Sequence, residues 1–331
     1  MVGSVGIVVN PVSGTDIRRL SSYANFVDNN QKAYILLKAI KVLEGLGVSK
    51  VILAPDFYGI INKTLDALGK ISVDIDIIDM KPVGGPEDTL VSVDYMVRHN
   101  AACIIILGGD GTVRIASKVS NQTPLIPIST GTNNVIPYFI DGSVAGFAAG
   151  VIALNKKSSI YYTVKIKKLD VFINGEFRDH ALVDVALTEY IFRGSKAVID
   201  VEKVGEAIVS IAKPTSIGLS SIGAMIEPIR MGSDKAIYFS LNRDSFGLKL
   251  RALIGPGILK SVIVNRVKIY KAGDIVVFNR TKKTYTIALD GEREIEVDPS
   301  DEIKAYINPD GPIIVDIENL VKAIAEGFIK I

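Results

Sequence analysis

The sequence predicts an α/β unit with a parallel sheet, followed by an antiparallel β unit. Over roughly the first 155 residues, short unbroken apolar runs alternate with segments whose apolar residues recur at helical spacing. Unbroken runs are typical of strands buried on both faces, and parallel strands need crossover helices between them. Beyond about residue 160, apolar and polar residues alternate singly, which is typical of antiparallel strands.

The first unit contains five apolar runs, each followed by a helical pattern. Residues 28–30 offer caps for the first helix, and glycines at 45 and 47 end it. Such alternation predicts a Rossmann-like sheet, which binds ligands at the carboxyl ends of its strands. The expected strands are 5–9, 51–54, 73–78, 101–107 and 124–128, and the expected helices are 33–43, 60–68, 90–99, 113–119 and 142–154.

The second unit is expected to be a β-sandwich, since alternating segments are joined by turn residues such as Asn174-Gly175. A final strand at 312–317 and a helix at 319–329 return to the α/β pattern, and we expect them to pack on the first domain. We place the domains at 1–155, 156–310 and 311–331. The expected strands of the sandwich are 161–166, 170–173, 181–187, 197–201, 236–241, 262–270, 275–278, 284–289 and 294–297.

Composition excludes several classes of function. The net charge of +2 gives no bulk attraction to nucleic acid. No apolar run reaches the roughly 18 residues of a membrane span, so no integral membrane contact is expected. The N-terminus has no basic leader, and the single cysteine, Cys103, cannot form an internal disulfide; together these favour the cytoplasm.

The segment Gly108-Gly109-Asp110-Gly111-Thr112 is the strongest functional signal. It follows the apolar run at 101–107 and precedes a helical pattern, so it lies at a strand-to-helix crossover. Glycines there let another group approach the main chain, and the start of the helix favours an anion such as phosphate. A carboxylate in such a loop suggests chemistry at Asp110, although a tight turn with an N-capping Asp is the alternative.

Two further loops follow predicted strands. Asn10 to Gly14 end the first strand with a Ser/Gly loop, and residues 130–134 end the fifth with a polar Thr-Gly-Thr-Asn-Asn cluster. Both would lie at the edge of the sheet where ligands bind. Arg18 and Arg19 follow the first loop and could clamp a phosphate. The loop at 81–86 could be a lid, but we favour a simple connection.

The complete Gly-Gly-Asp-Gly-Thr string resembles the signature of the superfamily that includes NAD kinases and the diacylglycerol and sphingosine kinases. Within it, the chain is most similar to the acetoin-catabolism protein X group of ATP-NAD-kinase-like proteins. Residues 16–19, 128–134 and 290–293 match strings of that group, and the resemblance covers nearly the whole chain.

The resemblance implies a small-molecule kinase that uses ATP, or polyphosphate, with Mg²⁺ and acts on a hydroxyl. Asp110 would accept the proton of that hydroxyl or hold Mg²⁺, and Asp290 or Glu292 could be the base instead. An Asp-Gly hairpin turn is the alternative for Asp290-Gly291. The residues expected to bind the donor are Asn10, Ser13, Gly14, Gly108, Gly109, Gly111, Thr112, Arg114, Thr130, Gly131, Thr132, Asn133 and Asn134.

On the acceptor side the resemblance implies contacts from Asp184, Ser216 and Ser220, with NAD as the default acceptor. The Leu-Asn-Glu motif of NAD kinases is here Leu182-Val183-Asp184, and Ile217 and Gly218 replace hydroxyl residues of a second motif. Another small metabolite is therefore a serious rival. The resemblance is also compatible with a lipid kinase or with a non-catalytic nucleotide-binding protein. It further implies a homo-oligomer assembled through the β-rich domain.

Overall fold

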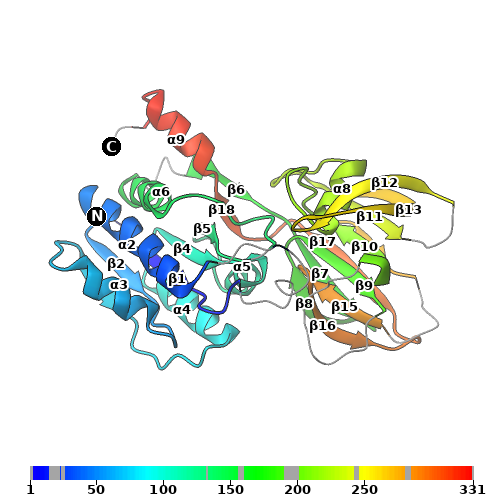
Figure 1. Ribbon diagram of the computed structural model, residues 1–331, viewed down its shortest axis with the longest axis horizontal. Helices are drawn as coiled ribbons and strands as arrows, with labels where there is room; N and C mark the ends of the chain where they lie inside the picture. The colour runs from blue at the N-terminus through cyan, green and yellow to red at the C-terminus, as the bar shows by residue number, and fades with distance from the viewer. Residues whose placement is uncertain are drawn as a thin grey trace.

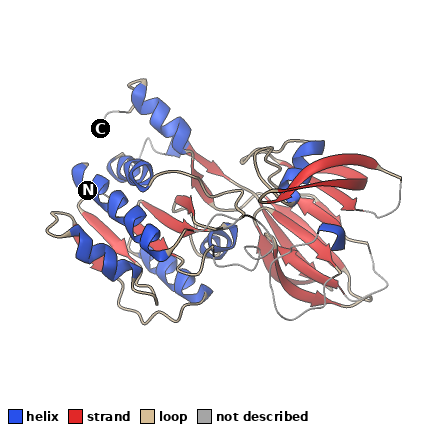
Figure 2. Cartoon of the chain, viewed as in Figure 1, coloured by secondary structure: helices blue, strands red, loops and turns tan. Residues whose placement is uncertain are grey.

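The computed structural model describes residues 3–14, 23, 27–131, 133–155, 160–189, 201–241, 246–279 and 285–329. The chain forms two lobes, with α5 (Asp110–Ser117) at their junction (Figure 1). Most of the helices gather in one lobe and most of the strands in the other (Figure 2). Among the described residues, no helix has both the length and the apolar character needed to cross a bilayer.

The first lobe is built on a seven-stranded sheet of order β3-β2-β1-β4-β5-β18-β6. The strands from β3 to β18 are parallel, and only β6, at the edge, is antiparallel to its neighbour. The strands are β1 (Val5–Val9), β2 (Lys50–Leu53), β3 (Asp74–Ile77), β4 (Cys103–Gly108), β5 (Leu125–Ser129), β6 (Thr163–Lys165) and β18 (Ile313–Val315).

Helices cover both faces of this sheet. One apolar cluster joins the sheet to α2 (Asn29–Gly45), α3 (Ile60–Leu68), α6 (Gly142–Leu154) and α9 (Ile317–Ala325). A second cluster, on the other face, includes side chains of α4 (Pro86–Arg98) and α5. The small residues of α6 allow close packing, since a Cβ at Gly146 would lie 2.4 Å from the Ala39 carbonyl oxygen.

The second lobe is a sandwich of a seven-stranded and a four-stranded sheet. Apolar side chains of both sheets form the core between them, and α8 (Leu219–Ile226) covers the outer face of the larger sheet. The strand order of the larger sheet is β12 (Leu248–Gly255), β13 (Ile258–Lys271), β11 (Lys235–Leu241), β10 (Val204–Val209), β9 (Asp184–Thr188), β15 (Tyr285–Leu289) and β16 (Glu292–Val297). The strand order of the smaller sheet is β14 (Ile275–Val277), β17 (Ile303–Asn308), β7 (Lys168–Ile173) and β8 (Glu176–Ala181).

The predicted fold class is confirmed, including the return of the C-terminus, since β18 pairs with β5 and α9 packs on the first lobe. Strands β10, β12 and β17, nearly all of β8 and helix α8 were not predicted. The expected strand at 181–187 is interrupted, because β8 ends at Ala181 and β9 begins at Asp184. The expected strand at 197–201 and residues 15–22 lie almost wholly outside the described residues.

Helix α5 connects the two lobes through polar contacts with β8. The Arg114 guanidinium donates to Asp179 at 2.9 Å, and Lys118 Nζ lies 2.7 Å from the other oxygen of that carboxylate. The Ser117 hydroxyl lies 2.8 Å from Nε2 of His180. Burial lowers the pKa of His180 to about 4, only partly opposed by the charge of Asp179, so the imidazole at this junction is neutral at pH 7.

This neutral imidazole should make the junction sensitive to acid. The pKa of His180 in the folded chain lies below that of an unfolded histidine, so the unfolded chain binds more protons between about pH 4 and 6.5. The free energy of unfolding should therefore fall as pH drops through this range. In an NMR titration of the two imidazoles, the resonance lost in His180→Gln should titrate near pH 4. Titration of that resonance near pH 6.5 would contradict this assignment.

Candidate functional site

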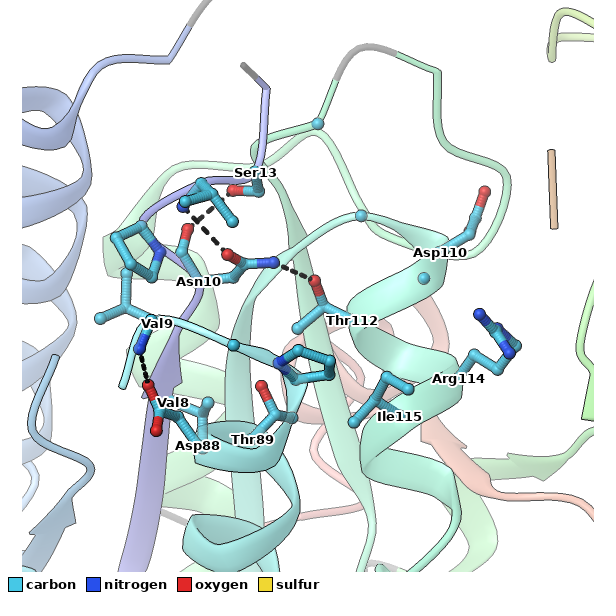
Figure 3. Close-up of a pocket in the computed structure, with 18 of the residues that line it drawn as sticks. Val8, Val9, Asn10, Ser13, Asp88, Thr89, Asp110, Thr112, Arg114 and Ile115 are labelled. Carbon is cyan, nitrogen blue, oxygen red and sulfur yellow. Dashed lines mark hydrogen bonds between the residues drawn. The ribbon is translucent and has the colours of Figure 1, made fainter. Parts of the chain in front are cut away.

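A cleft of about 430 Å³ opens at the carboxyl ends of β1, β4 and β5. The loop after each strand contributes to it, as expected for an open parallel sheet. Figure 3 shows Asn10, Ser13 and Thr112 close together at the strand ends, with Asp110 and Arg114 on another side of α5. The second lobe contributes Asp179, Asp290 and Glu292, so the cleft lies between the two lobes.

The loop after β1 is held by its own polar side chains. Asn10 accepts a hydrogen bond from the Val12 amide through Oδ1 and donates to Thr112 Oγ1 at 2.8 Å through Nδ2. The Ser13 hydroxyl lies 2.7 Å from that of Thr130. Gly14 has φ +80°, and a Cβ there would lie 2.6 Å from the Thr130 carbonyl oxygen, so only glycine fits. These contacts join the loop after β1 to the segment after β4, through Thr112, and to the loop after β5, through Thr130.

A buried lysine that the sequence analysis did not select supports this loop from beneath. Lys32, on α2 and 1% exposed, donates through Nζ to the carbonyl oxygens of Asn10, Pro11 and Ser13 at 2.9–3.1 Å. Burial lowers its pKa to about 8, although nearby acidic groups partly oppose the shift. Lys32 lies four residues before Leu36 on the apolar stripe of α2. A lysine at a position that faces the core was the sequence signal that could have identified it as a functional residue.

Glycines allow the loop after β4 to pass closely between its neighbours. A Cβ at Gly108 would lie 2.5 Å from the side chain of Thr112, and one at Gly109 would lie 2.8 Å from Asn134 Oδ1. Gly109 is the N-cap of α5, which begins at Asp110. The first turn of this helix therefore faces the cleft, where its amides and dipole favour an anion.

Asp110 is 6% exposed, and both its oxygens accept main-chain hydrogen bonds. Oδ2 accepts from the Val135 amide at 2.8 Å, and Oδ1 accepts from the Ile136 amide at 2.9 Å. The carboxylate thus fixes the segment after β5 against the start of α5, a structural role that the sequence analysis did not assign. It still lines the cleft and a smaller cavity beside it.

The loop after β5 brings three of its predicted residues to the cleft, Gly131, Asn133 and Asn134. The side-chain amide of Asn134 lies 2.7 Å from Ser129 Oγ and, oriented to satisfy its neighbours, accepts from the Gly131 amide at 3.2 Å. Thr130 is 1% exposed and faces Ser13. Thr132 lies outside the described residues.

Arg114 and Asp290 form a buried ion pair across the junction of the lobes. Arg114 Nε lies 3.6 Å from Asp290 Oδ2, and the two side chains are 3% and 0% exposed. Asp290 also accepts hydrogen bonds from the amides of Leu182, Val183 and Asp184. Burial raises the pKa of Asp290 to about 6, although Arg114 and these amides restrain the rise. Arg114, expected to contact the donor, is therefore engaged by two carboxylates.

The turn between β15 and β16 contains the Asp290-Gly291 pair. Both residues have positive φ, +51° and +78°, as in a two-residue hairpin turn, so the structural alternative for this pair is present in the fold. The next residue, Glu292, points its carboxylate toward the start of α5. Its Oε1 lies 3.3 Å from the position of a Cβ on Gly111. Both residues line the cleft, but the Asp290 side chain is fully buried, whereas Glu292 is partly exposed.

The predicted acceptor residues separate into two groups. Asp184, 7% exposed, lines the smaller cavity. The Ser216 hydroxyl donates to the Lys213 carbonyl at 2.6 Å and the Ser220 hydroxyl to the Ile211 carbonyl at 2.7 Å, and neither residue lines either cavity. Ile217, Gly218 and Leu219, from the same segment, face the smaller cavity instead. These serines satisfy buried main-chain groups.

The loop favoured as a mere connection also reaches the cleft. Gly84, Gly85 and Pro86 line it, and Gly85 is the N-cap of α4. Asp88 holds this loop by accepting from the amides of Val83 and Gly84. A second helix N-terminus therefore faces the same space as α5.

Within the described residues, the side chains of this site do not by themselves form a complete set of ligands for a divalent cation. No group of three or more His, Cys, Asp or Glu side chains that could hold a metal occurs within the described residues. Mg²⁺ is commonly held by one or two carboxylates together with substrate phosphates and water. Asp110 and Glu292 both line the cleft, so their carboxylates are the side chains of the two lobes placed to take part in such a site.

Comparison with known proteins identifies the family and the fold. Residues 5–152 match the ATP-NAD kinase N-terminal domain, and residues 167–310 match the acetoin catabolism protein X C-terminal domain. The chain is 31% identical over 315 residues to acetoin catabolism protein X of Cupriavidus necator, covering 92% of this chain and 87% of the relative. The chain belongs to the acetoin catabolism protein X family.

Two further matches extend the comparison. An uncharacterized protein of Archaeoglobus fulgidus is 29% identical over 133 residues, which are 40% of this chain and 36% of that protein. The structure of yeast NADH kinase complexed with NADH aligns with a TM-score of 0.53 and 12% identity, over 98% of this chain and 87% of that one. This member of the acetoin catabolism protein X family therefore has the NAD kinase fold. The match of its N-terminal domain to ATP-NAD kinases supports its assignment as a phosphotransferase.

Lys32→Met should weaken binding of an anionic probe, inorganic tripolyphosphate, in the cleft by about tenfold or more. Charged donors stabilise their acceptors by ~1.5–3 kcal/mol each, and three loop carbonyls would lose their charged donor. Binding to the unchanged protein should also weaken as pH rises through about 8, where Lys32 loses its proton. Calorimetric titration at pH 7 and 9.5 measures both effects. Lys38→Met, on the exposed side of α2, is the control. An identical pH profile in Lys32→Met would refute this role.

Arg114→Met should lower the free energy of unfolding by about 3–5 kcal/mol at pH 8, because it leaves a buried carboxylate without its cation. The loss should be smaller at pH 5, since Asp290 can then take up a proton. Denaturant unfolding at both pH values measures it. Arg98→Met, whose side chain is 75% exposed, should change stability by less than about 0.5 kcal/mol. Equal effects of the two substitutions would contradict the proposed burial cost.

Proposed function

We propose that this protein is an ATP-dependent kinase that phosphorylates the hydroxyl of a small molecule. The observation that carries the proposal is the cleft between the lobes, in which the starts of α4 and α5 converge with carboxylates from both lobes. Phosphoryl transfer requires alignment and neutralisation of charge more than covalent chemistry by the protein. A site of this kind supplies both.

The donor's phosphates would bind at the loops after β1 and β4. The helix-start amides near Gly109 and Thr112 would donate to phosphate oxygens, while Lys32 keeps the carbonyls of the β1 loop turned away from them. Asn133 and Asn134 would contact the nucleoside. Mg²⁺, when bound with the donor, would neutralise charge on the phosphates, with Glu292 as a protein ligand; Asp110 would be a ligand only if another carboxylate is the base. Polyphosphate in place of ATP would use the same phosphate contacts.

The reaction moves one phosphoryl group and one proton. The bond between the γ-phosphorus and the bridging oxygen breaks, the acceptor oxygen bonds to that phosphorus, and ADP leaves. The acceptor's proton passes to a carboxylate. Asp110 and Asp290 both line the cleft and the smaller cavity, and Asp110 is favoured as this base because it keeps 6% exposure, whereas the Asp290 side chain has none. The Asp290 side chain is 0% exposed and accepts hydrogen bonds from three amides, which favours a positioning role. Glu292 lines the cleft but not the smaller cavity.

The family makes NAD the first acceptor to test. A lipid kinase and a nucleotide-binding protein without catalysis remain the alternatives, and cytoplasmic location and assembly into a homo-oligomer remain predictions. The decisive experiment incubates the protein with γ-labelled ATP and Mg²⁺ against NAD, NADH, small hydroxy compounds and a diacylglycerol. Label in a small molecule supports the proposal; label in the lipid alone favours a lipid kinase. ATP binding without transfer to any acceptor or to water would refute catalysis.

Glu292→Gln should reduce turnover in the same assay by about 10²–10⁴, if its carboxylate assists the transfer. The unfolding midpoint should not change, because the side chain faces the cleft rather than the core. Glu296→Gln, an exposed residue of the same strand, is the control. Undiminished turnover in Glu292→Gln would leave Asp110 as the base. Asp110→Asn is less informative, since the new amide would also break a hydrogen bond to Val135 or Ile136.

A further inference from the structure

The smaller cavity adjoins the cleft and has about 70 Å³ of space. The two share Asp110, Asn133 and Asp290 in their linings. Since one buried water needs roughly 10–15 Å³, the smaller cavity has room for about five or six ligand atoms. A molecule seated there would end beside Asp110, where the phosphate-binding space begins.

Most of the cavity wall is apolar. Val183 precedes β9, Val204 begins β10 and is 2% exposed, and Ile217 precedes α8. Ribose hydroxyls or a carboxamide buried against these side chains would lack hydrogen-bond partners, at a substantial cost. The serines that could have supplied partners are bonded to main-chain carbonyls. The apolar side chains are Val135, Val183, Val201, Val204, Ile217, Leu219, Ile254, Pro256 and Ile258.

The end of the cavity that it shares with the cleft is polar, since Asp110, Asn133 and Asp290 line both spaces. Asp184 also lines the cavity. Oδ1 of Asn133 is buried and accepts no hydrogen bond from the described part of the chain. A buried acceptor of this kind requires a donor, and a ligand hydroxyl directed to this end would supply one. The polarity of the cavity therefore matches a molecule with a hydroxyl at one end and a short carbon chain.

We propose that the acceptor is a short aliphatic hydroxy compound of about five or six non-hydrogen atoms rather than NAD. This inference rests on the kinase function proposed above. The hydroxyl lies between Asp110 and Asn133, and the carbon chain contacts Val183, Val204 and Ile217. The γ-phosphoryl group of ATP bonds to the hydroxyl oxygen, the proton passes to Asp110, and ADP leaves. A dinucleotide or an acyl chain that entered the smaller cavity would have to extend beyond it.

Val204→Phe tests the cavity, because the larger side chain occupies it. Val277→Phe, at a position 53% exposed on β14, is the matched control. The probe is 3-hydroxybutan-2-one, observed by saturation-transfer NMR with a non-hydrolysable ATP analogue present. The unchanged protein and Val277→Phe should transfer saturation to its methyl protons, and Val204→Phe should not. With labelled ATP, kcat/KM for this probe should fall at least about tenfold in Val204→Phe.

Other outcomes separate this inference from the kinase proposal. Saturation transfer that Val204→Phe abolishes, with no phosphorylation of any acceptor, supports the small-molecule site while refuting the kinase function. Phosphorylation of NAD or dioctanoylglycerol that Val204→Phe leaves unchanged overturns the inference and leaves the kinase intact. No saturation transfer in the unchanged protein also overturns it. If Val204→Phe does not fold, Ile254→Phe, at a half-buried position of the same wall, replaces it.

Discussion

The buried charges around Arg114 hold the two lobes in the arrangement that creates the site. Arg114 on α5 contacts Asp179 on β8 and Asp290 in the β15–β16 turn, and Lys118 adds a second cation to Asp179. Burial would raise the pKa of Asp179, but the hydrogen bond from Lys118, the His180 amide and the charge of Arg114 outweigh it and lower the pKa. Because unpaired buried charges are costly, this cluster favours one orientation of α5 relative to the β lobe.

Several polar side chains of the cleft hold its loops in place, whether or not they also contact a ligand. Asp110 joins the start of α5 to the segment after β5, and Asn10 joins the β1 loop to Thr112. Lys32 holds the carbonyls of the same loop. Such preorganisation fixes the directions of main-chain amides before any ligand binds, which is what electrostatic stabilisation of a transferring phosphoryl group needs. A residue can therefore be essential here without touching the reacting atoms.

The part of the cleft at the strand ends, where the donor is proposed to bind, was largely predictable from the sequence. Glycine-rich or polar segments directly after apolar runs must lie at one edge of a parallel sheet, and the residues around Ser13, Asp110 and Asn133 do meet there. The acceptor side was not predictable. Ser216 and Ser220 match a hydroxyl-rich pattern, yet their direction depends on the carbonyls that α8 brings near. From the sequence, residues 84–86 could only be predicted as a turn. Their position beside the cleft depends on how α4 packs against the sheet, which the local sequence does not specify.

The sequence alone determined the class of each lobe, the return of the C-terminal strand and the position of the loops that line the cleft. These follow from local periodicity and from the handedness and direction of parallel strands, which act over short stretches of chain. Only the tertiary structure decided that Lys32 supports the β1 loop, that Arg114 serves the junction, and that apolar side chains line the smaller cavity. Those facts depend on contacts between segments distant in sequence, whose side-chain directions no local pattern specifies.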